Sequence, residues 1–172
     1  GWEGGFGRRV LGETWVEHHG DHGKEGTRGL INGVFENHPI LNGVQDIWGP
    51  TDVYTIRDLP ENAEVLVYGQ VTEGMTPESM VNFKKSIMPV AWIRHYKGEK
   101  GLSTPIFATT MGASVDLVNE DLRRLLVNAC YWAVGFEKQI PERGDVSIIG
   151  KYEPTMFGFG SFQKGLKPSD YR

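Results

Sequence analysis

The sequence predicts a single domain of mixed α and β structure, on two observations. Three segments rich in β-branched and aromatic residues, 64–71, 89–96 and 105–110, are typical of strands. One later segment, 120–134, carries apolar residues at helical spacing. Strands followed by one long helix, without a visible internal repeat, indicate an α/β or α+β domain. At 172 residues the chain is long enough to bury one core.

In the first half of the chain the sequence predicts short helical turns and one short strand. Residues 6–11 fit a short helix that turns its two arginines outward. Residues 38–44 predict a turn and a single helical turn, because Pro39 suits a first helical position and Gly43 suits an end. Residues 52–57 alternate as a strand does. Further on, 89–96 and 105–110 predict a β-hairpin, since a glycine-containing turn joins them.

The helix over 120–134 has clear end signals. Asn119 can cap its first turn, and the acidic pair Glu120 and Asp121 suits the positive end of the helix dipole. Gly135 is well placed to stop it. We expect one apolar stripe to pack into the core: Leu122, Leu125, Leu126, Ala129, Cys130 and Ala133. After residue 141 the pattern fades into a glycine- and aromatic-rich arm, 142–172. Its aromatic residues should pack on a neighbouring surface or join two copies; they are Phe157, Phe159, Phe162 and Tyr171.

Composition excludes several classes of function. The net charge of −4 argues against a nucleic-acid partner, which would need a basic face. No apolar run approaches the ~20 residues of a membrane span. Cys130 is the one cysteine, so the sequence allows no disulfide within the chain and leaves the compartment, cytoplasmic or periplasmic, undetermined.

The richest segment for chemistry is 18–29, HHGDHGKEGTRG, with three of the five histidines. Glycine at every third position disfavours a helix or strand there and favours a loop. Three interpretations stay open: a polar surface loop, a divalent-metal site, and a metal-free substrate or acid/base site. For a metal, His18 and His22 are the candidate imidazole ligands, and Glu13 or Glu25 would complete a His/His/carboxylate set suited to zinc.

For acid/base catalysis the same loop offers other roles. His19 or His22 would transfer the proton, oriented by Glu13 or Asp21. Arg28 would bind a sugar hydroxyl or an anionic group.

Several ordered motifs over about 4–140 resemble the ThuA-like (trehalose-utilisation) family. They are HPILNGV at 38–44, TDVY at 51–54, then PVAWIRHYKGEKG, PIFATTMGAS and NEDLRRLLVNACYWAVG between 89 and 135. The resemblance implies that 1–141 is a flavodoxin-like α/β three-layer sandwich, related to class I glutamine amidotransferases. It also implies a bacterial protein of carbohydrate utilisation, a hydrolase or lyase acting on a sugar or keto-sugar.

The resemblance adds expectations about the pocket. His18, Arg28, Asp52 and Tyr54 would line a substrate crevice at the strand ends. The family's first strand and loop, which hold part of the pocket, have no counterpart in the sequence, so the fold is expected to be incomplete at its front. Where the family often shows Gly-His, this chain has Gly112-Ala113, so no histidine role carries over.

Cys130 lies on the helix stripe and not at a strand-to-helix elbow, which excludes a cysteine-dependent amidotransferase. A non-catalytic sugar-binding or assembly module is the alternative to an enzyme.

Overall fold

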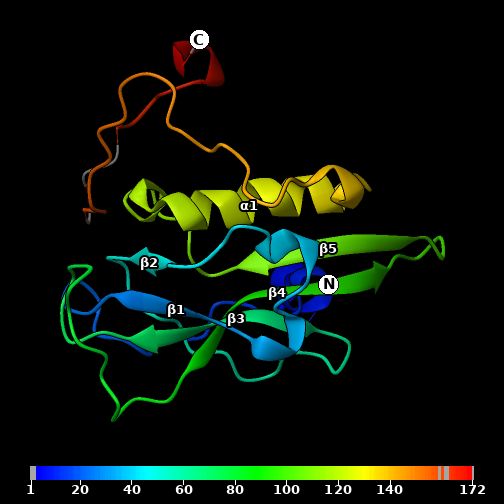
Figure 1. The fold of residues 1–172 in the computed structure, drawn as a ribbon, viewed down its shortest axis with the longest axis horizontal. Coiled ribbons are helices and arrows are strands. Elements are labelled where there is room, and N and C mark those ends of the chain that lie inside the picture. The colour runs from blue at the N-terminus through cyan, green and yellow to red at the C-terminus, as the bar shows by residue number, and fades with distance from the viewer. Residues whose placement is uncertain (1–2, 159, 161–162, 172) are drawn as a thin grey trace.

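The computed structural model describes residues 3–158, 160 and 163–171 (Figure 1). Its main elements are β1 (Thr27–Ile31), β2 (Trp48–Gly49), β3 (Glu64–Val71), β4 (Met88–Lys97), β5 (Ser103–Thr109) and α1 (Glu120–Ala133). Short helical turns lie at Gly7–Leu11, Gly33–Phe35, Pro39–Leu41, Asp116–Val118, Glu137–Gln139 and Pro168–Tyr171.

The five strands form one antiparallel sheet in the order β2-β1-β3-β4-β5. The expected flavodoxin-like three-layer sandwich is therefore wrong. Such a fold needs parallel strands joined by helical crossovers, whereas the described residues contain a single α-helix, which lies along one side of the curled sheet (Figure 1). The hairpin of β4 and β5 is confirmed, with Lys97 opposite Ser103 at its turn.

Sequence pattern explains the central strands. Leu66 and Val67 of β3 are both fully buried, and β4 buries Val90 to Ile93 in succession. Consecutive burial means that both sides of these strands are covered near the middle of the sheet. The core is completed by Ile40, Leu41, Val44, Ile47, Val53, Val71, Met111, Leu122, Leu125 and Ala129.

Helix α1 begins and ends almost where the sequence predicts. The Asn119 side chain accepts a hydrogen bond from the backbone N–H of Leu122 at 2.8 Å, and Gly135 adopts a φ of 79° just past the end. Leu122 and Leu125 enter the core as expected. Cys130 and Ala133 do not: both are exposed, and both line a surface groove beside β5.

Three further segments differ from expectation. The last three residues of the expected loop 18–29 instead begin β1 and pair with β2 and β3. Residues 52–57 form no sheet strand; they run beside 17–20, and only Tyr54 makes a bridge, with His18. Beyond α1, the arm follows the helix on the side away from the sheet, where Arg123 donates to the Val146 carbonyl (Figure 1). Phe157 is 69% exposed. Phe159, Phe162 and the side chain of Tyr171 lie outside the described part of the structure.

Candidate functional site

The histidine-rich loop is fixed against the segment that contains Asp52. The backbone N–H groups of His19 and Gly20 both donate to the carbonyl of Val53 at 2.9 Å. A Cβ on Gly20 would lie 3.0 Å from the Cβ of Asp52 and 3.2 Å from the Val53 nitrogen, so glycine allows the loop to come this close. The loop therefore places its imidazoles beside a carboxylate that lies thirty or more positions away in the chain.

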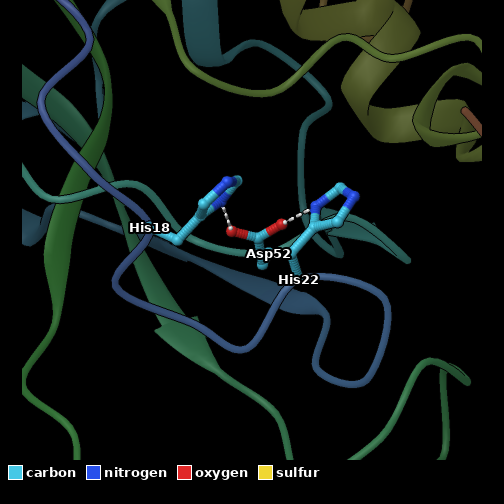
Figure 2. A group of neighbouring side chains, drawn as sticks. All are labelled: His18, His22 and Asp52. Atoms are coloured by element: carbon cyan, nitrogen blue, oxygen red, sulfur yellow. Dashed lines mark hydrogen bonds and ion pairs between the residues drawn. The ribbon is translucent and has the colours of Figure 1, made fainter. Parts of the chain in front are cut away.

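Three of the predicted residues meet in one cluster, which we call the His18–Asp52–His22 cluster (Figure 2). Nδ1 of His18 lies 2.7 Å from Oδ2 of Asp52, and Nδ1 of His22 lies 2.8 Å from Oδ1. The Asp52 side chain is 1% exposed, whereas those of His18 and His22 are 41% and 37% exposed. An ionised carboxylate only accepts hydrogen bonds, so both imidazoles donate from Nδ1 in this arrangement.

Asp52 differs from the other buried carboxylates in the described part of the chain. Each of those accepts at least two hydrogen bonds or ion pairs, and each accepts from at least one backbone N–H; they are Glu13, Glu25, Asp116 and Asp121. Among the described residues, the side chain of Asp52 has only the two imidazoles as hydrogen-bond or ion-pair partners. A buried carboxylate without a fixed cation or backbone donor is costly unless a positive charge comes to it.

A cavity of about 470 Å³ opens beside the cluster on the His22 side. Its walls come from Thr51, the turn that contains Ser114, and the C-terminal arm at Thr155, Met156 and Phe157. The arm is held there by the Tyr152 hydroxyl, which donates to the Ser114 carbonyl at 2.6 Å. Its volume falls in the range of small-molecule sites.

On the other side, His18 packs edge-on against two aromatic rings. Its centroid lies 5.7 Å from that of Trp15 and 5.5 Å from that of Tyr54. Burial, together with the nearby carboxylates of Asp52 and Asp116, raises the pKa of Tyr54, so its hydroxyl stays protonated at neutral pH.

Glu13, expected to orient a catalytic histidine, contacts no histidine in the described structure and is bound instead by backbone N–H groups and Arg8. Its carboxylate accepts from the backbone N–H groups of Thr14, Arg57 and Asp58 at 2.8 to 3.0 Å, and it pairs with Arg8 at 2.6 Å. Burial alone would raise the pKa of Glu13, but these donors and the Arg8 charge outweigh it and hold the pKa below 4.5. Glu13 therefore holds the backbone at 57–58 in place through two hydrogen bonds.

His19 and Arg28 also lie apart from the cluster. Nε2 of His19 is 2.8 Å from the Ser86 carbonyl, and Arg28 pairs with Asp46 and the Pro77 carbonyl. Glu25, weighed as a metal ligand, is instead held by Lys85 at 2.6 Å. These contacts tie the loop to its neighbours and leave His18 and His22 as the histidines next to Asp52.

Sequence reasoning missed Trp15 and the arm residues at the cavity. Trp15 stands three positions before His18, and a tryptophan so near a histidine-rich segment is the signal that could have found it. Nothing in the order of residues indicates that Met156 and His22 line the same cavity, because this depends on how the arm folds back.

No family model, no curated protein and no solved structure matches this chain. Among the residues that the structure describes, no helix combines the length and the apolar character needed to cross a bilayer.

Proposed function

We propose that this protein is a metal-dependent hydrolase or lyase that acts on a carbohydrate, with the His18–Asp52–His22 cluster as its metal centre. The observation that carries the proposal is the buried Asp52 carboxylate. It is hydrogen-bonded to two imidazoles, and no backbone N–H group or fixed cation among the described residues contacts it. A divalent cation would supply the missing positive charge.

The donor set fits such an ion. Two imidazole nitrogens and one carboxylate oxygen are a ligand combination that catalytic zinc sites use, with a further position left for substrate or water. One ligand atom from each residue can be chosen so that all lie within 4.8 Å of one another. Tetrahedral zinc holds its ligand atoms about 3.3 Å apart, so modest side-chain rotations would close the set.

Each part of the site would then have a role. The ion would supply Lewis-acid polarisation of a substrate oxygen. His18, His22 and Asp52 would hold the ion, and the 470 Å³ cavity would hold the substrate against His22, with Ser114 and Thr51 on its polar side. The carbohydrate substrate is proposed from the motifs that resemble the ThuA-like family; the fold that this resemblance implied is not carried over.

The test is metal content followed by turnover. We expect about one equivalent of a divalent metal in the wild-type protein by elemental analysis, and much less in His18→Ala and His22→Ala. His19→Ala is the matched control, because its imidazole lies on the Ser86 carbonyl and not on Asp52. A chelator should abolish turnover of sugar and keto-sugar substrates, and Zn²⁺ should restore it.

A second candidate follows from the same geometry. Asp52 orients His22 at the edge of the cavity, which is also how a carboxylate positions a metal-free acid/base histidine. Turnover that persists in chelator but is lost in His22→Ala would favour this mechanism. A sugar-dependent rise in the melting temperature without any product would instead indicate a binding module.

A further inference from the structure

We infer that the protein has a second sugar subsite, lined by Trp15 and Tyr54, and that its substrate is at least a disaccharide which passes over the His18–Asp52–His22 cluster. This inference rests on the proposed function, because it assigns the substrate class of the same centre. It is carried by a second cavity, distinct from the one beside His22, which is lined by the two aromatic residues that pack against His18.

The second cavity measures about 220 Å³. It lies between the segments at 11–15 and 54–56 and the end of β5, and its aromatic walls are Trp15, Tyr54 and Trp92. His18 joins it to the cluster, since the imidazole packs edge-on against both Trp15 and Tyr54. The cluster therefore has one cavity next to His22 and another next to the aromatic partners of His18.

The three aromatic residues differ in a way that indicates binding. Trp92 is 3% exposed, and its Nε1–H donates to the Leu11 carbonyl at 2.8 Å, so it belongs to the fold. Trp15 is 60% exposed at the cavity, and no hydrogen-bond partner for its indole N–H lies among the described residues. Apart from its edge-on contact with His18, most of this side chain is open to a ligand. A flat apolar surface with one polar tip suits a ligand that is apolar on its faces and polar at its edges.

Polar groups at the same cavity suit a sugar. The Tyr54 hydroxyl has no hydrogen-bond partner within the described part of the chain, and Thr14 and Thr110 also line the cavity. A pyranose ring offers apolar C–H faces to an aromatic ring and hydroxyl groups around its rim. A cavity of 220 Å³ suits one such ring, and the larger cavity next to His22 would take the other. The linkage between the two rings would then lie at the cluster.

The test compares binding of one ring with binding of two. Calorimetric titration of the intact protein would use glucose and three glucose disaccharides: maltose, cellobiose and trehalose. We expect at least one disaccharide to bind about tenfold more tightly than glucose, and Trp15→Ala to reduce that preference to less than about twofold. Tyr54→Phe, which keeps the ring and removes only the hydroxyl, should reduce it to an intermediate value and covers the case in which Trp15→Ala fails to fold.

Phe136→Ala is the matched control, because Phe136 is an aromatic of similar exposure, 51%, that lies after α1 and away from both cavities. Disaccharides that bind no better than glucose, absence of any binding, or a preference unchanged in Trp15→Ala would overturn the inference. Metal content measured on the same samples separates the two proposals. Metal without a disaccharide preference rejects the subsite alone, and a disaccharide preference without metal rejects the metal centre alone.

Discussion

Nδ1 of His22 lies 2.8 Å from Oδ1 of Asp52, although thirty positions separate the two residues in the chain. This contact and the matching one from His18 enclose the Asp52 carboxylate, whose side chain is only 1% exposed. In the described structure Asp52 is bound by two imidazoles, whereas the other buried carboxylates are bound by backbone N–H groups, hydroxyl groups or cationic side chains.

Asp52→Asn should weaken Zn²⁺ binding about 100-fold or more while the fold persists. The amide keeps the volume of the side chain but loses the charge and offers one oxygen in place of two. Calorimetric titration with ZnCl₂ measures the affinity, and circular dichroism checks the fold. Asp46→Asn is the control, because that carboxylate is 74% exposed and pairs with Arg28 outside the cluster. Equal zinc affinity in Asp52→Asn and wild type would rule out Asp52 as a ligand.

Glu13→Gln should destabilise the protein by about 2 kcal/mol at pH 7 and leave zinc binding unchanged. The native pKa of Glu13 is held below 4.5, so its stabilising effect is fully present above pH 4.5 and is lost as pH falls through the native value. Urea unfolding at several pH values measures this difference, which should shrink toward pH 3. A difference that stays constant with pH would show that the charge of Glu13 contributes nothing.

His38 should cause a second pH-dependent change in the free energy of unfolding, at higher pH than the change caused by Glu13. Burial lowers the pKa of His38 below 6.5 despite the opposing charge of Glu64, and its Nδ1 accepts from the backbone N–H of Ile40 at 3.2 Å. The folded state therefore favours neutral His38, and the free energy of unfolding should fall as pH drops below 6.5.

His38→Asn tests this effect. Asparagine can still accept from the Ile40 N–H but does not titrate, so the variant should lose part of the decline in stability between pH 7 and pH 5.5. Thermal melts across that range measure it. Identical pH profiles for the variant and the wild type would contradict the assignment.

Arg124→Met should cost about 3–5 kcal/mol of stability. The guanidinium is 1% exposed and contacts the carboxylates of Glu120 and Asp121 and the carbonyl of Gly144. Arg124→Lys should rescue little, since an ammonium group lacks the planar fork that reaches these partners at once. Arg57→Met is the surface control, because Arg57 is 56% exposed and its pair with Glu17 is screened by water. Chemical denaturation compares the three; a cost under 1 kcal/mol for Arg124→Met would contradict the prediction.

Local signals predicted the elements well where neighbours in sequence decide the structure. The Asn119 cap and Gly135 set the ends of α1, and the β4–β5 hairpin follows from a turn between two strand-like segments. The prediction of a sheet strand at 52–57 was wrong. In the described structure this segment makes a single bridge, between Tyr54 and His18, and alternation does not reveal which partner a segment will have.

The sequence likewise predicted part of the candidate site and left its contacts undecided. The sequence identified His18, His22 and Asp52 one by one, since imidazoles in a glycine-rich loop and an acid in a familiar motif attract attention. It also offered Glu13 and His19 for the same chemistry. Backbone N–H groups around Glu13 and the Ser86 carbonyl beside His19 separate these two from the cluster, and no spacing in the sequence encodes those contacts.

The sequence by itself determined the residue types available for chemistry, the helix α1 and the segments of β3, β4 and β5, because propensity, capping and periodicity act over a few neighbouring residues. The tertiary structure decided that the strands pair antiparallel, that Cys130 faces outward, and that Asp52 lies between two imidazoles. Strand partners and buried ion contacts join residues far apart in the chain. Their choice depends on which surfaces can be buried together, which the local pattern does not specify.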